Sequence, residues 1–170
     1  MFYKILLLLP VLFVFSGVSG QMNSLDENKP VVTDGIEYGY TIRNEQVKSA
    51  KGEEYARFEI TLYATNNSGC TKLYADRVSF RSDETPNLIA TYNCSNANGK
   101  RLTAKSGMVK ARDFYVNAKV TEAGKEVNQS VKAGYIFRNG ETIKNNIIVL
   151  VPKGERPIFS FATNNLPELR

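Results

Sequence analysis

The sequence predicts an all-β sandwich, and three observations support this prediction. Apolar residues recur at every second position in several segments, as in strands that bury one face. Turn-forming residues separate these segments, and no long segment has the helical period. The chain has 170 residues, which suits a single domain after removal of a leader.

The N-terminal segment is typical of a secretory signal peptide. Lys4 precedes an apolar run over residues 5–15, and small residues follow at 16–20. The run is shorter than the roughly 20 apolar residues that a membrane anchor needs, which disfavours that alternative. We expect cleavage after Gly20, secretion or a periplasmic location, and no membrane span after cleavage. The expected segments are signal peptide 1–20, polar leader 21–30, β-sandwich 31–164 and C-terminal tail 165–170.

The alternating segments predict about eight or nine short strands. Even-numbered residues are apolar over 36–42, 58–64, 88–94 and 114–120, while the odd-numbered ones are mainly polar. Residues 147–151 are apolar at every position, as expected for an interior strand. The even-numbered side chains are therefore predicted to form the core.

Two breaks and one turn are predicted between these strands. The parity of the apolar positions changes near Asp76 and near Arg112, which indicates β-bulges or strand breaks. The dipeptide Asn139-Gly140 favours a type I′ turn that joins two strands as a tight hairpin.

A resemblance refines the fold class. The stretch from Phe58 to Phe80, a strand followed by Asn-Asn-Ser-Gly and a second strand, resembles a segment of many bacterial immunoglobulin-like extracellular modules. The overall layout is also similar to small uncharacterised secreted proteins of Bacteroidetes. The resemblance implies an immunoglobulin-like β-sandwich of about eight or nine strands, with a closed barrel as the structural alternative. It implies no activity and no functional residues.

The two cysteines are expected to form a disulfide. An isolated pair usually bonds in an oxidising compartment. Cys94 shares the parity of the apolar face of its strand, which suits a bond to Cys70 in the core. Two free thiols are the alternative.

The residue types exclude most catalytic chemistry. Because the chain has no His, it has no Ser-His-Asp triad, no Cys-His dyad and no His-ligated metal. No glycine-rich nucleotide motif occurs, and the short acidic clusters lack the spacing of a calcium site, so we expect no cofactor and no metal. A carboxylate pair remains, with Glu59, Asp76 and Asp113 as the candidates that lie within strands. A hydrolase of this kind requires Asp76 and Asp113 to lie within about 10 Å of each other.

A basic segment is a possible patch for an anionic ligand. Its residues are Lys100, Arg101, Lys105, Lys110 and Arg112. An anionic glycan or lipid headgroup fits such a patch. The alternative is a solvated edge strand, because Lys at an edge discourages sheet-to-sheet association.

Two tyrosines are candidates for sugar binding. Tyr63 and Tyr115 have the polar parity and are predicted to be exposed, and the Asn-rich loops contain Asn66, Asn67, Asn96 and Asn98. Aromatic stacking with amide hydrogen bonds is a way to hold a sugar. The alternative is ordinary strand composition, since Tyr is favoured in strands.

We therefore expect a secreted or periplasmic, non-catalytic binding or interaction module. Its ligand is not identified by the sequence. A surface glycan or a protein are the partners considered, and nucleic acid is not expected for an exported chain. The alternatives are a small carboxylate-dependent glycan hydrolase, and a secreted inhibitor or accessory subunit of a surface complex.

Overall fold

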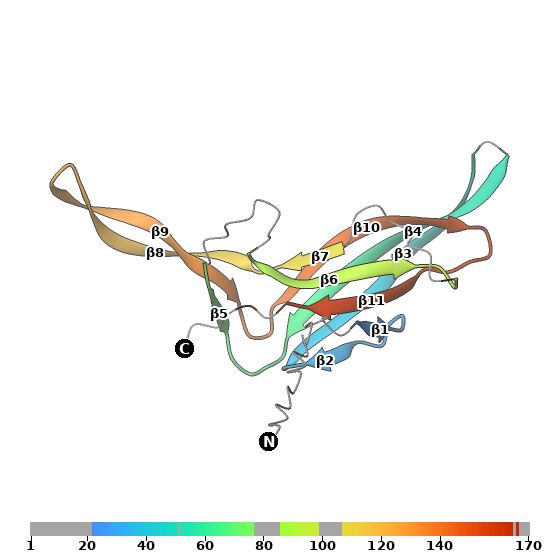
Figure 1. Cartoon of the computed structure of the whole chain (residues 1–170), viewed down its shortest axis with the longest axis horizontal. Coiled ribbons are helices and arrows are strands. Elements are labelled where there is room, and N and C mark those ends of the chain that lie inside the picture. The colour runs from blue at the N-terminus through green and yellow to red at the C-terminus, as the bar shows by residue number, and fades with distance from the viewer. Residues whose placement is uncertain (1–21, 51, 77–85, 99–106, 165, 167–170) are drawn as a thin grey trace, which may run out of the picture.

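The computed structural model describes residues 22–50, 52–76, 86–98, 107–164 and 166. Within these ranges the chain forms eleven strands in three antiparallel sheets and no helix, so the prediction of an all-β fold is confirmed (Figure 1). The number of strands exceeds the eight or nine expected. No helix in the described part of the chain is long and apolar enough to span a membrane.

The strands are distributed over the three sheets as follows. The β6 sheet has the order β1 (Asn23–Leu25), β11 (Ile158–Thr163), β6 (Leu88–Ser95), β7 (Gly107–Lys110). The β4 sheet has the order β10 (Thr142–Pro152), β4 (Glu53–Asn66), β3 (Ile36–Ala50), β2 (Val31–Thr33). The β9 sheet has the order β5 (Lys72–Ala75), β9 (Lys125–Phe137), β8 (Arg112–Glu122).

The core lies between the β6 sheet and the β4 sheet. The ring of Tyr38 stacks on Phe161 at 4.7 Å between centroids, and that of Tyr40 packs on Phe159 at 4.5 Å. Strands β3 and β4 bury their even-numbered apolar residues over 36–40 and 58–64, as the alternation predicts. These contacts join the two sheets into the layers of a sandwich.

Strand β10 corrects one prediction. Residues 147–151 were expected to form an interior strand, but β10 is the edge of the β4 sheet. Val149 and Val151 are buried, whereas Ile148 and Leu150 face outward and are 57% and 53% exposed. The strand therefore buries only the face that bears Val149 and Val151, and its other face is exposed to solvent.

The chain crosses between sheets at the predicted breaks. Strand β7 ends at Lys110 and β8 begins at Arg112 in another sheet, with Ala111 between them. The backbone N–H of Ala111 donates to Asn87 O at 2.8 Å, and Asn87 Nδ2 donates to Ala111 O at 2.9 Å. The break near Arg112 is therefore confirmed, and so is that near Asp76, since β5 ends at Ala75.

The Asn139-Gly140 turn is present, but the predicted hairpin is wrong. Glu141 N donates to Arg138 O at 3.0 Å, which closes the turn. Gly140 has a positive φ of 74° and Asn139 does not, so the turn is not of type I′. The strands that it joins, β9 and β10, lie in different sheets. Long-range pairing decides the sheet, while the dipeptide decides only that the chain turns.

Strands β8 and β9 extend beyond the sandwich as an arm, residues 114–133, seen in yellow and orange in Figure 1. Strand β5 pairs with β9 only from Gly134 to Phe137, so the arm is a two-stranded ribbon. The alternation over 114–120 is real, but Val116 is 38% exposed, and the predicted burial of this face is wrong. The β3–β4 hairpin projects at the other end of the molecule.

The start and end of the chain are described only in part. Strand β1 lies within residues 21–30, the segment predicted as a polar leader, and Leu25 is buried in the core. Leu166 packs against the same core. The predicted signal peptide lies outside the described residues, as do residues 165 and 167–170 of the predicted tail.

Candidate ligand-binding surfaces

The outer face of the β4 sheet contains a shallow groove of about 330 Å³. Ligand sites in proteins have volumes of roughly 300–1,000 Å³. Three adjacent strands line it. The lining residues are Glu37, Thr41 and Arg43 of β3, Thr61, Tyr63 and Thr65 of β4, and Thr142 and Lys144 of β10. All but Thr142 and Lys144 are odd-numbered, because the even-numbered side chains of β3 and β4 point into the core.

Tyr63 lies at the centre of this groove, against the backbone of the neighbouring strand. Its partner across the β3–β4 ladder is Gly39. A Cβ at Gly39 would lie 2.5 Å from Tyr63 Oη, so the ring occupies the space that a side chain would fill. Burial, followed by the charge of Glu37, raises the pKa of Tyr63. The glycine thus allows the tyrosine ring to lie across the sheet surface.

Arg43 lies in the groove at a β-bulge of β3. It lines the outer face beside Thr41 because alternate residues of a strand share a face, whereas Ile42 packs against the core. The register of β3 against β4 shifts between Ile42 and Asn44, so β3 has one extra residue there. Beyond the bulge the parity changes, since Asn44 is opposite Glu59.

Cross-strand hydrogen bonds hold the polar side chains of this face. Thr61 Oγ1 donates to Asn146 Oδ1 at 2.7 Å, and the hydroxyls of Thr65 and Thr142 lie 3.0 Å apart. Asn67 Nδ2 donates to a carboxylate oxygen of Glu37 at 3.3 Å. The surface is thus preorganised, with hydroxyl, amide and charged groups around one aromatic ring.

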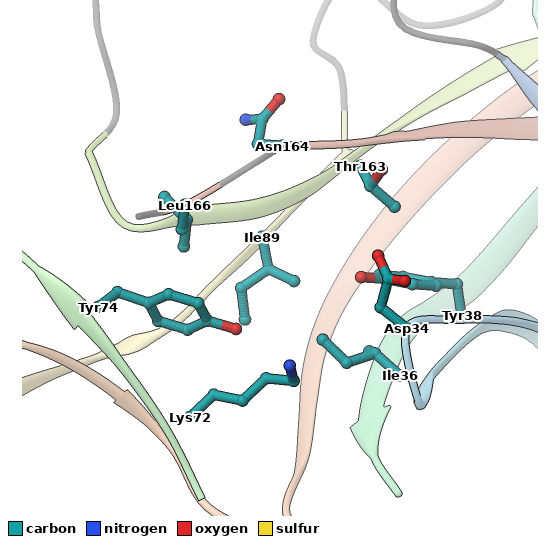
Figure 2. Close-up of a pocket in the computed structure, with 9 residues that line it drawn as sticks. All are labelled: Asp34, Ile36, Tyr38, Lys72, Tyr74, Ile89, Thr163, Asn164 and Leu166. Carbon is teal, nitrogen blue, oxygen red and sulfur yellow. The ribbon is translucent and has the colours of Figure 1, made fainter. Parts of the chain in front are cut away.

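A second, smaller pocket lies at one end of the sandwich (Figure 2). Its polar lining comes from Asp34, Tyr38, Lys72, Tyr74, Thr163 and Asn164, and its apolar lining from Ile36, Ile89 and Leu166. Burial, followed by Tyr74 and Asp34, raises the pKa of Tyr38, so its hydroxyl stays protonated. The pocket has about 80 Å³, well below the roughly 300–1,000 Å³ of typical ligand sites.

The carboxylates of Asp76 and Asp113 do come together. Lys132 Nζ lies 3.7 Å from Asp76 Oδ2 and 3.1 Å from Asp113 Oδ1. Tyr135 Oη donates to Asp76 Oδ1 at 2.8 Å. The two carboxylates therefore lie well within the limit of about 10 Å that a glycosidase pair requires. The third candidate, Glu59, forms an ion pair with Arg57 on the outer face of the β4 sheet.

The position of Lys132 argues against catalysis at this pair. A glycosidic bond has to lie between two catalytic carboxylates, and one of these has to hold a proton. Here the ammonium group of Lys132 contacts both carboxylates, where the glycosidic bond would have to lie. Its own pKa is raised by the hydrogen bond to Tyr135 and by Asp113, so it stays charged. We interpret the cluster as a clamp between β9, β8 and the end of β5.

The predicted basic patch is described in part. Lys100, Arg101 and Lys105 lie outside the described residues. Lys110 is exposed on β7, and Arg112 Nε lies 2.7 Å from a carboxylate oxygen of Glu141. The two described members thus flank the crossing from the β6 sheet to the β9 sheet.

The predicted disulfide is wrong, since Cys70 and Cys94 are both free. Cys94 is buried in β6 opposite Phe159, whereas Cys70 is exposed in the loop after β4. That loop lies at the end of the sandwich where β6 begins. Cys94 lies five positions after Ile89, which is about 17 Å of extended strand. A disulfide needs Cα atoms within roughly 7 Å.

The other residues predicted to bind a sugar differ in exposure and in position. Tyr115 is 54% exposed, as predicted, but lies on the arm, away from the groove. Asn66 and Asn96 are buried, so the prediction that they contact a sugar is wrong. Asn67 is exposed beside the groove, where it bonds Glu37. The polar parity of Tyr63 was the signal for the site, whereas its threonine neighbours needed the register of three strands.

No protein family, curated protein or solved structure matches the chain.

Proposed function

We propose that this protein is a secreted or periplasmic, non-catalytic module that binds a neutral polysaccharide on the outer face of the β4 sheet. The observation that carries the proposal is the groove around Tyr63. Its ring lies across Gly39, and polar side chains from three strands surround it.

The chemistry of the groove suits a sugar chain. The apolar face of a sugar ring packs on an aromatic ring, and its hydroxyls need both donors and acceptors. The threonine hydroxyls supply both, while Lys144 donates and Glu37 accepts. Acidic and basic side chains are both present, so a neutral chain is favoured over an anionic one.

The openness of the face suits a polymer. Small-molecule sites bury most of their ligand. This groove lies on a sheet surface, and the exposed side chains of Ile148 and Leu150 continue the same face along β10. A long chain can therefore contact the sheet beyond the groove, which a single sugar cannot.

We also propose the finer description of the fold and of its export. The stacked antiparallel sheets are consistent with an immunoglobulin-like sandwich, to which the β9 sheet is an addition. The charged, apolar and small-residue segments of positions 1–20 support the signal peptide.

Affinity gel electrophoresis tests the proposal. Native gels would contain a soluble α-glucan, β-glucan, xylan or, as an acidic comparison, alginate. We expect at least one neutral polysaccharide to slow the protein. Tyr63→Ala should remove most of this retardation, since the sugar ring packs on the face of the aromatic ring.

Tyr115→Ala is the matched control, because Tyr115 is an exposed tyrosine on a different sheet. It should bind as the wild type does. The proposal is overturned if no neutral polysaccharide retards the protein, or if Tyr63→Ala is retarded equally. Binding of alginate alone, lost in Arg101→Glu with Lys105→Glu, would instead assign the ligand to the basic segment.

A further inference from the structure

The arm is the least supported part of the described fold. No described element covers either face of its ribbon, and Tyr115, Val116, Val127 and Val131 are exposed. A two-stranded hairpin is only marginally stable in water on its own. This arm therefore has surface that a further strand would stabilise.

One face of the arm is apolar. Across the β8–β9 ladder, Val116 is opposite Val131 and Val120 is opposite Val127. Directly opposite residues share a face, so these valines line one side, with the pair Ala118 and Gln129 between them. Lys119 pairs with Asn128 on the other side and reaches Glu126 at 3.4 Å. The arm is thus amphipathic with no layer against its apolar side in the described residues.

The edge of β8 is also open. In the sheet order β5-β9-β8, no described strand pairs with the far side of β8. Natural edges are blunted by Pro, by bulges, by short length or by several charges. Strand β8 has eleven residues, no Pro and no Gly; three of its four charged residues lie at its ends, and Lys119 is the one between them. Its backbone groups are arranged to accept another strand.

We propose that two copies of this chain pair through the open edges of their β8 strands. The strands run antiparallel about a two-fold axis at Asn117, which is the central residue of β8. The arms overlap, and the two sandwiches lie at opposite ends of one four-stranded ribbon.

This register makes β8 complementary to itself. It places Val116 opposite Ala118 of the second copy, and Phe114 opposite Val120. At the ends it places Arg112 opposite Glu122, so opposite charges meet on both sides of the axis. An axis at Asn117 pairs all eleven residues of β8, whereas an axis at Val116 would leave Thr121 and Glu122 without partners. The full overlap, with apolar side chains opposite each other and opposite charges at its ends, favours a second copy over an unrelated strand.

Charged substitutions at the axis are the test. We expect the wild type to form a dimer whose fraction rises with concentration, measured by size-exclusion chromatography with light scattering. Asn117→Lys places two ammonium groups opposite each other and should weaken dimerisation by about tenfold or more. An equimolar mixture of Asn117→Lys and Asn117→Glu should restore a dimer that contains one copy of each. Because the variants share one exposed position, this rescue also excludes misfolding as the cause of the loss.

Ser130→Lys is the control, since Ser130 is the partner of Asn117 on β9 and lies away from the open edge of β8. It should dimerise as the wild type does. A wild type that stays monomeric at all concentrations would overturn the proposal. So would a dimer that Asn117→Lys leaves unchanged, or a mixture that shows no rescue. The polysaccharide site is on another sheet, so its assays and these give independent answers.

Discussion

Replacement of Asn66 by Ala should destabilise the fold strongly, because this buried side chain joins three segments. Asn66 Nδ2 donates to Phe137 O at 2.8 Å and to Cys70 O at 2.9 Å. Its Oδ1 accepts from Ser68 N at 3.1 Å and from Ser68 Oγ at 2.6 Å. These bonds fix the end of β4, the following loop and the end of β9. Asn66 itself is 0% exposed.

The magnitude follows from the number of bonds. Each hydrogen bond contributes about 0.5–1.5 kcal/mol net, and a buried group left without a partner costs about 1–3 kcal/mol. Four bonds are lost, so the free energy of unfolding should fall by about 3–4 kcal/mol. For a domain of this size, Tm should fall by about 10 °C.

Urea and thermal unfolding, followed by circular dichroism, measure this loss. Asn66→Asp retains the shape and the acceptor but turns an oxygen toward two carbonyls, so it should be similarly destabilised. Asn67→Ala is the matched control, because this exposed neighbour has one side-chain bond, to Glu37, and should change stability by less than about 1 kcal/mol. A loss below about 1 kcal/mol in Asn66→Ala, or equal losses in both alanine variants, would refute the reasoning.

Three further predictions concern thiols, glycines and pH. In the native protein a maleimide should label Cys70 but not Cys94, whose pKa burial raises to about 12, and a cross-linked peptide in mass spectrometry would contradict this. Gly134→Ala should lower Tm markedly, because its φ is +149° and a Cβ would lie 2.1 Å from a carbonyl oxygen of β5. Gly124→Ala is the control, since its Cβ would meet no atom within 4 Å and it tests the cost of positive φ alone. Equal losses of Tm in the two variants would exclude the clash. Burial raises the pKa of Tyr92, so the stability that this phenol contributes is complete below about pH 10 and is lost as the pH rises further. In urea unfolding above about pH 10, the free energy of unfolding should decline less in Tyr92→Phe than in the wild type. An identical decline in both proteins would refute this prediction.

The sequence predicted local features well where one residue pattern suffices. The even-numbered faces of 36–40 and 58–64 are buried, and the breaks near Asp76 and Arg112 lie where the parity changes. Both follow from the period of the strand. The outward position of Tyr63 follows from the same period.

The errors arise where a pattern does not identify the neighbouring layer. Alternation over 114–120 shows that one face is apolar, but no described element covers that face of the arm. An apolar run over 147–151 fits an interior strand and an edge strand equally, and β10 is the edge. The disulfide between Cys70 and Cys94 was inferred from their number, whereas their distance depends on how β6 and the loop after β4 are placed.

The candidate site was predictable in part for the same reason. Parity placed Tyr63 and Arg43 on the outer faces of their strands, but the groove also needs Lys144 from β10. These residues are far apart in the sequence. Their meeting depends on the order β10-β4-β3, which local patterns do not determine.

The most direct test of polysaccharide binding is a two-dimensional NMR titration with an oligosaccharide of the polymer that retards the protein most. We predict that the shifted backbone amides concentrate on the outer-face residues Thr41, Thr61, Tyr63 and Lys144. Shifts confined to the arm or to the end pocket of Figure 2, with the groove unchanged, would contradict the assignment of the site.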